Sequence, residues 1–373
     1  MLSKAVLSKI VKRKTLNIVL ATLLALYPTL QVTPVNAKNI TDEKVCYKGK
    51  SKIEKGQLYR CIEIKDKLLW VKVNNRVSKL GIDLYQGIAP GVEVKFGSVE
   101  MSIKTKDNRL RKYNVFAPKE LTKDKYYPLI IALHGGVGTA EGFESNSRLN
   151  NLAETNDFIV VYPGGINVDS DQVTIQSWNA GDCCGPASRK KVDDVLFISE
   201  MLKDLATKYP VDENKIYAVG HSNGGMMAYR LACELPDKIK GIGVQSASIG
   251  IPDCRPARAV KVIHIHGTND KRFPIEGGKG IGVTNTEFRS ARYAVNKFAR
   301  SNNCEIIPIH KKTENQDISV LDWENCESKV RYIIVKNASH AWMGSDAKTS
   351  PAEAPYKNLD ASKAILSFLF EDK

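Results

Sequence analysis

The sequence predicts an α/β fold in which helices flank a mostly parallel central sheet, preceded by a small disulfide-stapled β module. Two observations lead to this prediction. Short apolar runs alternate with amphipathic helical segments over residues 94–373, and a Gly-x-Ser-x-Gly motif lies between one such run and a helix. Alternation of this kind is typical of a parallel sheet covered by helices. The roughly 280 residues of this region suffice for one large core.

Residues 1–37 have the pattern of a signal peptide. Five basic residues and no acid accompany an apolar run from Leu16 to Tyr27, and Val35-Asn36-Ala37 supplies the small residues that precede cleavage. The run is short for a helix crossing a ~30 Å hydrocarbon core, so an uncleaved membrane anchor is the less favoured alternative. We therefore expect a secreted protein, at the exterior of the cell envelope or beyond.

Positive charge is concentrated near the N-terminus. The net charge of the chain is +14, and without residues 1–37 it is +9, from 50 basic and 41 acidic residues. Residues 38–92 hold twelve Lys and Arg against six Asp and Glu. Outside the cell such a segment would contact an anionic wall or membrane surface, and an ordinary solvated surface is the alternative. No nucleic-acid motif accompanies it, so we expect no nucleic-acid partner.

The remaining chain divides into three parts. Residues 38–80 hold two cysteines and a β-like run from Leu68 to Val73, which predicts a small basic β module. Residues 81–93 contain three glycines and a proline and read as a linker. Residues 94–373 form the expected catalytic domain.

Eight cysteines in an exported chain indicate disulfides rather than metal ligands. Closeness in the sequence predicts two disulfides, one between Cys46 and Cys61 and one between Cys304 and Cys326. Cys183 and Cys184 are adjacent, so we expect each to reach either Cys233 or Cys254, in an order that the sequence leaves open.

Strands and helices can be placed along the catalytic domain from their apolar patterns. An opening hairpin is expected from residues 101–105 and 113–117, followed by strands at 129–133, 158–162, 216–220, 241–245, 260–266 and 330–335. Helices are expected at 193–209, 223–234, 287–300 and 361–370.

Gly220-His221-Ser222-Asn223-Gly224 fits the nucleophile elbow, a tight strand-to-helix turn that lifts a serine above the sheet. An apolar strand from Ile216 runs into the motif and a helix-forming run from Met226 leaves it. That is the context which the elbow requires, so Ser222 is the expected nucleophile.

A serine hydroxyl needs a histidine as base and a carboxylate to orient that histidine. Of the six histidines, His340 alone follows the last expected sheet strand in a polar loop. Asp270 follows the strand ending at His266, where α/β sheets gather functional groups. Ser222, Asp270 and His340 also stand in the chain order of the α/β-hydrolase triad. The competing acids, Asp193 and Asp194, precede the nucleophile and suit a helix N-terminus instead.

Hydrolysis through an acyl-enzyme also needs donors for the developing oxyanion. His134-Gly135-Gly136 follows the first central strand. We expect one donor from the backbone N–H of Asn223 and a second from Gly135 or Gly136, and the alternative is a plain glycine turn.

Residues from about 94 onward resemble the polyhydroxybutyrate depolymerase-type esterases, a family that includes secreted feruloyl and acetylxylan esterases. Six motifs carry the resemblance in order: Leu133-His134-Gly135-Gly136, Ser177-Trp178-Asn179-Ala180-Gly181 before Cys183-Cys184-Gly185, Val192-Asp193-Asp194-Val195, the elbow, His264-Ile265-His266-Gly267-Thr268 before Asp270, and Ser339-His340-Ala341-Trp342.

The resemblance implies an α/β-hydrolase fold, an extracellular ester hydrolase, no cofactor and no metal, with a triad of Ser222, Asp270 and His340. Trp178 and His221 would line the substrate pocket, although core packing is an equal alternative for Trp178. The turn Lys271-Arg272-Phe273-Pro274 is more basic than the usual family version, and the loop 277–284 is glycine-rich, so the pocket rim is expected to differ.

The sequence thus predicts a monomeric serine esterase that acts on small or polymeric esters. Two alternatives fit the same sequence. One is a serine peptidase of the same fold, which shares the triad and its order. The other is an inactive hydrolase fold that binds cell wall through residues 38–80.

Overall fold

The computed structural model describes residues 51–54, 57–64, 67–72, 95–122, 125–166, 176–281, 286–346 and 353–371. Contacts divide the chain into two compact units, residues 1–74 and 75–373. The expected signal peptide, the linker and Cys46 lie outside the described residues, so the pairing of Cys46 with Cys61 stays a prediction. No helix in the described ranges is both long and apolar enough to cross a bilayer.

The first unit contains a three-stranded antiparallel sheet. Its strands are β1 (Ser51–Glu54), β2 (Gln57–Ile64) and β3 (Lys67–Lys72), in the order β1-β2-β3. Short connections join them, as expected for antiparallel neighbours. The β-like run predicted from Leu68 falls in β3.

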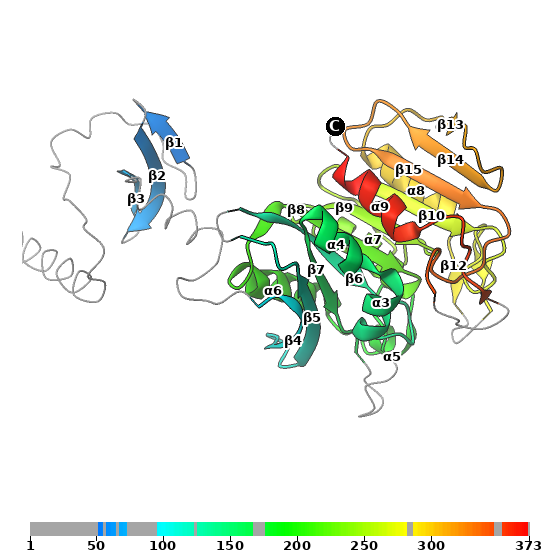
Figure 1. The fold of residues 1–373 in the computed structure, drawn as a ribbon, viewed down its shortest axis with the longest axis horizontal. Helices are drawn as coiled ribbons and strands as arrows, with labels where there is room; N and C mark the ends of the chain where they lie inside the picture. Colours follow the sequence, from blue (N-terminus) through cyan, green and yellow to red (C-terminus); the bar gives the residue numbers. More distant parts are fainter. Residues whose placement is uncertain are drawn as a thin grey trace, which may run out of the picture. The chain divides into compact units, whose positions relative to one another are not determined.

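The second unit is built on a sheet whose described strands follow the order β13-β14-β15-β10-β9-β8-β6-β7-β5-β4 (Figure 1). The six central strands, from β15 to β7, are parallel, and both edges are antiparallel. The strands are β4 (Gly97–Lys104), β5 (Leu110–Ala117), β6 (Tyr127–Leu133), β7 (Ile159–Pro163), β8 (Val211–His221), β9 (Ile239–Gln245), β10 (Lys261–Gly267), β13 (Ile309–Lys311), β14 (Ile318–Trp323) and β15 (Val330–Val335).

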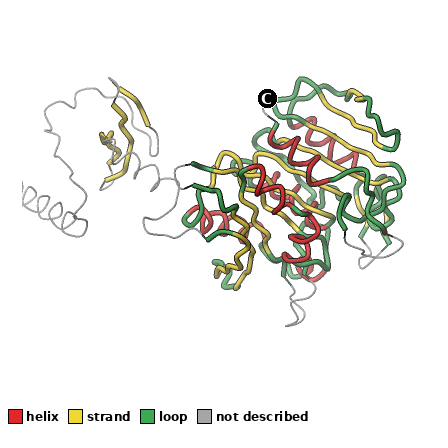
Figure 2. Tube along the Cα trace, viewed as in Figure 1, coloured by secondary structure: helices red, strands yellow, loops and turns green. Residues whose placement is uncertain are grey.

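Helices cover both faces of this sheet (Figures 1 and 2). One face carries α3 (Ala140–Ser147), α4 (Leu149–Asn156) and α9 (Ala361–Phe370). The other carries α6 (Asp194–Ala206), α7 (Asn223–Glu234) and α8 (Ala291–Ser301), and a short helix, α5 (Gly185–Arg189), precedes α6. This arrangement is the α/β-hydrolase fold, which confirms the fold class predicted from the sequence.

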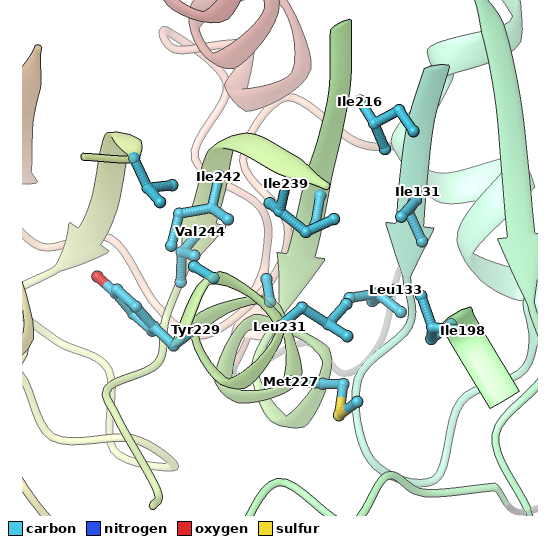
Figure 3. Close-up of a cluster of buried hydrophobic side chains, with 14 of the residues drawn as sticks. Ile131, Leu133, Ile198, Ile216, Met227, Tyr229, Leu231, Ile239, Ile242 and Val244 are labelled. Atoms are coloured by element: carbon cyan, nitrogen blue, oxygen red, sulfur yellow. The ribbon is translucent and has the colours of Figure 1, made fainter. Parts of the chain in front are cut away.

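Alternation along the strands divides the apolar side chains between two cores. On β6, Leu129, Ile131 and Leu133 join the core beneath α6, α7 and α8, whereas Ile130 and Ala132 join the core beneath α3, α4 and α9. Successive strand residues point to opposite faces, so a parallel strand covered on both sides must be apolar throughout. Figure 3 shows Met227 and Leu231 of α7 among the first set.

Helix boundaries follow local capping. The predicted limits of α7 and α9 match the structure, whereas α8 begins at Ala291 instead of Glu287. Ser290 caps α8 by accepting a hydrogen bond from the N–H of Tyr293. The residues before it form β12 (Glu287–Phe288), which pairs with β11 (Gly278–Lys279).

The disulfides correct one prediction. Cys304 pairs with Cys326 as predicted, but Cys183 and Cys184 pair with each other and do not reach across to Cys233 or Cys254. Cys233 lies in the last turn of α7 and Cys254 follows β9, and their Cα atoms lie 5.2 Å apart, a separation suited to a direct bond. Cys233 and Cys254 therefore form a disulfide with each other.

Candidate active site

Ser222 occupies a strained turn between β8 and α7. Its backbone has φ = 53° and ψ = −121°, a conformation that residues other than glycine rarely adopt. Gly220 and Gly224 allow it, because a Cβ on Gly220 would overlap the carbonyl of Gly224 and a Cβ on Gly224 would overlap that of Leu133. The geometry is that of the predicted elbow, and Ser222 lies at the carboxyl ends of the parallel strands.

His340 and Asp270 lie together although the loops that carry them are distant in sequence. The Nδ1 atom of His340 is 3.0 Å from Oδ1 and 2.9 Å from Oδ2 of Asp270. The loops follow β15 and β10, which are paired in register, so their carboxyl ends meet. Because an ionised carboxylate only accepts hydrogen bonds, Nδ1 carries the proton and Nε2 keeps a free lone pair.

The surroundings of Asp270 favour its ionised form. Burial alone would raise the pKa of this carboxyl, but the hydrogen bond and charge of His340 outweigh burial and hold the pKa below its usual value. The N–H groups of Phe273 and Arg272 also donate to Oδ1, at 2.8 and 3.1 Å. The buried carboxylate of Asp270 therefore accepts hydrogen bonds from three donors: the ring of His340 and the backbone N–H groups of Arg272 and Phe273.

The two competing acids have other partners. Asp193 caps α6 by accepting from the N–H of Leu196 at 2.9 Å. Asp194 is buried and forms an ion pair with Arg111 at 2.7 Å. Asp193 therefore caps a helix, as its position in the sequence favoured, and Asp194 joins the start of that helix to Arg111 on β5.

A directed chain of hydrogen bonds supports the turn that carries Asp270. His266 Nε2 donates to the carbonyl of Phe273 at 2.8 Å, so its Nδ1 accepts from His264 Nε2 at 3.0 Å. His264 Nδ1 in turn accepts from the hydroxyl of Tyr229 at 2.8 Å. Burial lowers the pKa of both histidines, which keeps the chain neutral and its direction fixed.

The loop after β6 lies against the elbow. A Cβ on Gly135 would be 3.4 Å from that of Ser222, and one on Gly136 would be 3.6 Å from that of Asn223. His134 fixes the loop: its Nε2 accepts from the N–H of Gly165 at 2.9 Å, so its Nδ1 donates to the carbonyl of Gly135 at 2.7 Å. Burial lowers the pKa of His134 to about 4, so this arrangement persists at neutral pH.

Of the two roles predicted for Trp178, the structure shows core packing and not pocket lining. Its side chain is fully buried and is absent from the cavity wall. The indole N–H donates to the carbonyl of His134 at 2.9 Å, and the backbone of Trp178 exchanges hydrogen bonds with the side chain of Asn223. Trp178 thus connects the glycine loop after β6 to Asn223 of the elbow through hydrogen bonds to both.

His221, the other predicted pocket residue, does line the cavity. Its Nε2 donates to the carbonyl of His340 at 2.7 Å, because a carbonyl can only accept. Burial, together with the nearby His340, lowers the pKa of His221 to about 3. His221 is therefore a neutral donor that holds the backbone of the histidine loop.

These elements surround a cavity of about 510 Å³. Ser222, Asn223 and His340 line it together with both glycines of the loop after β6. Much of the remaining wall is apolar, from side chains on α3, α7, the β11–β12 hairpin and the loops after β10 and β15: Phe143, Met226, Phe273, Ile281, Phe288 and Trp342.

The rim differs from the wall in charge. Arg272 forms an ion pair with Glu353, and both residues line the cavity. Phe273, next in the chain, stacks on Phe288 with ring centroids 4.0 Å apart. The basic turn at residues 271–274 thus contributes one charged side chain, Arg272, and one aromatic side chain, Phe273, to the cavity wall.

Sequence reasoning missed several contributors. Phe288 was expected to begin a helix, and Glu353 lies in a loop without an element pattern. Gln245, the last residue of β9, was read only as the end of an apolar strand. The signal available was its polarity at the carboxyl end of a central strand, where functional groups gather.

Comparison with known proteins identifies similar proteins that are described as esterases. The protein family described as "Putative esterase" matches residues 105–306. Feruloyl esterase B of Piromyces equi is 30% identical over 243 residues, which cover 62% of this chain and 42% of that protein. The bifunctional acetylxylan esterase/xylanase XynS20E of Neocallimastix patriciarum is 22% identical, over 63% of this chain and 32% of its own. The chain therefore spans less than half the length of these two relatives.

Among solved structures, an acetyl xylan esterase from Aspergillus awamori superimposes with a TM-score of 0.48 and 16% identity. The match covers 65% of this chain and 94% of that one.

Proposed function

The chain belongs to the putative esterase family, and from this premise we propose that it is a secreted serine esterase that hydrolyses carboxylic esters through an acyl-enzyme on Ser222. His340 would take the proton of Ser222 as the ester carbonyl is attacked and return it to the leaving alcohol. Asp270 would hold the imidazole in the required tautomer. Water would then release the acyl group by the same route.

The observation that carries this proposal is the contact of His340 with Asp270 at a cavity that Ser222 also lines. A carboxylate 2.9 Å from Nδ1 directs the free lone pair of Nε2 away from itself, and Ser222 and His340 line one cavity. A nucleophile, a base and an orienting acid are the parts that acyl transfer needs.

For the oxyanion we propose the N–H groups of Asn223 and Gly136. The carbonyl of Gly135 is held by His134 and by the N–H of Gly138 at 3.1 Å. In a trans peptide the N–H of the next residue points the opposite way, so the N–H of Gly136 faces away from these partners. This orientation favours Gly136 over Gly135 as the donor.

For the substrate we propose esters with an aromatic or short acyl group, of the kind that polyhydroxybutyrate depolymerase-type, feruloyl and acetylxylan esterases hydrolyse. The aromatic side chains of Phe143, Phe273 and Phe288 line the cavity and suit a flat aryl group. The two relatives described above are named as a feruloyl esterase and an acetylxylan esterase. No cofactor enters this mechanism. Residues 38–80 would contact an anionic cell-wall polymer, and the enzyme would act as a monomer.

The test is secretion followed by hydrolysis. A host expressing the full chain should release a protein beginning at Lys38 that cleaves p-nitrophenyl acetate and methyl ferulate without added metal. Ser222→Ala should abolish both activities while folding normally, and a fluorophosphonate should label the wild type but not the variant. An active Ser222→Ala variant, or a wild type that is neither active nor labelled, would refute the proposal.

A further inference from the structure

Gln245 lies between the elements that carry the proposed nucleophile and base. It ends β9, where its neighbours in register are His221 on β8 and Ile265 on β10. Its side chain is fully buried, although a primary amide carries two donors and a carbonyl oxygen that need partners.

One residue makes three hydrogen bonds to the two halves of the site. Its backbone carbonyl accepts from the N–H of Ser222 at 3.0 Å. Its side-chain Nε2 donates to the carbonyl of Ala341 at 3.0 Å, and its Oε1 accepts from the N–H of Met343 at 2.9 Å. The bonded groups of Ala341 and Met343 lie just after His340 in the chain.

Both halves need such support. Ser222 has a strained backbone, and His340 belongs to an irregular loop whose buried backbone groups require partners outside a sheet or helix. His221 holds the carbonyl of His340 itself, so the three successive peptide groups between His340 and Met343 are each hydrogen-bonded. The side chain of Gln245 supplies two of these bonds and cannot rotate without losing both.

We propose that Gln245 is a positioning residue that fixes the distance between Ser222 and His340 and so sets the rate of proton transfer between them. This inference rests on the function proposed above. Displacing a reacting group by about 1 Å can cost on the order of 100-fold in rate. We therefore expect Gln245→Met, which keeps the length of the side chain but not its hydrogen bonds, to lower kcat by about 10- to 100-fold and to leave KM nearly unchanged.

Gln245→Glu gives a sharper test through pH. A protonated carboxyl can donate to the carbonyl of Ala341 and accept from the N–H of Met343, as the amide does, whereas an ionised carboxylate cannot donate. Burial raises the pKa of a carboxyl. The ratio of variant to wild-type kcat should therefore be near one at low pH and fall as pH rises, within a window of about pH 5 to 10.

Dividing by the wild type removes the titration of neighbouring groups. These are His221 on β8, His264 and His266 on β10, Asp270 after it, Tyr229 on α7 and His340 on the loop. All of them are present in both proteins, so a change in the ratio reports the introduced carboxyl together with any shift that it causes in the pKa of these groups.

Asn302 is the matched control. It too is a fully buried amide that bridges backbone groups: its Oδ1 accepts from the N–H of Val260 at 3.1 Å, and its Nδ2 donates to the carbonyls of Val260 and Ser328. It does not line the cavity. Asn302→Asp should lower the midpoint of thermal unfolding without a pH-dependent loss of kcat relative to wild type.

The full chain should be assayed for kcat, KM and backbone hydrogen exchange. Gln245→Met should speed exchange at residues 221–223 and 337–343, and the Asn302 variant should not. Folded Gln245 variants with wild-type kcat at every pH would overturn the proposal, as would unchanged exchange in both segments. If the wild type lacked Ser222-dependent activity, the proposed function would fail, whereas the exchange data would still decide the role of Gln245.

Discussion

Nδ1 of His340 lies 2.9 Å from Oδ2 of Asp270, 70 residues earlier in the chain. The contact fixes which nitrogen of His340 carries the proton, because the carboxylate can only accept. It also places a negative charge beside the ring, which would stabilise the imidazolium of the proposed mechanism, formed when the ring takes a proton from Ser222.

Asp270→Asn should lower kcat by about 10⁴-fold, because the amide removes the charge and can present its NH₂ group to Nδ1. Steady-state kinetics with p-nitrophenyl acetate would measure the loss. Asp193→Asn is the control, since asparagine caps a helix as well as aspartate does, and it should behave as wild type. A large loss in the control with little change at Asp270 would assign the orienting acid elsewhere.

Asp194→Ala should destabilise the fold by about 3–5 kcal/mol, because it leaves Arg111 charged and buried without its partner. Burial raises the pKa of Asp194, although Arg111 opposes that shift. Urea unfolding would measure the difference. Glu100→Ala removes the exposed partner of Lys112, the next residue along β5, and should cost less than about 1 kcal/mol. Equal costs for the two variants would contradict this account of the pair.

Stability should fall as pH is lowered from about 7 to 4.5, because buried histidines take up protons only after unfolding. The pKa of His221 is lowered to about 3 in the folded state, so the unfolded chain binds a proton first as pH falls. This residue alone would cost about 3 kcal/mol at pH 4.5.

His221→Gln should flatten that dependence, since glutamine does not titrate but can still donate to the carbonyl of His340. His310→Gln, at an exposed position on β13, should leave it unchanged. Urea unfolding at several pH values would compare the three proteins. A slope in His221→Gln as steep as in the wild type would show that His221 takes up its proton equally in the folded and unfolded states, which contradicts the lowered pKa.

Gly224→Ala should lower kcat by about 10²- to 10³-fold, the cost of losing one oxyanion donor. The added Cβ would overlap the carbonyl oxygens of Leu133 and His134, which must move and carry the glycine loop away from Ser222. Kinetics on the folded variant, checked by circular dichroism, would test this. Wild-type kcat would mean that the loop supplies no donor.

Local sequence was enough for the features that depend on neighbours in the chain. The strand into Ser222 and the helix out of it follow from an apolar run, two glycines and a helix-forming segment, and the limits of α7 and α9 were predicted to the residue. The proximity of Asp270 and His340 was also predictable, since each follows a strand of one parallel sheet and the carboxyl ends of such strands meet.

Only the tertiary structure decided which buried polar groups satisfy one another. Trp178 was predicted either in the pocket or in the core, and the structure places it in the core; Cys183 and Cys184 were predicted to reach Cys233 and Cys254 but bond to each other. Gln245 carried no motif at all. Its role depends on two loops that converge on the end of β9, and a sequence pattern records the polarity of a residue but not which distant backbone groups need a partner.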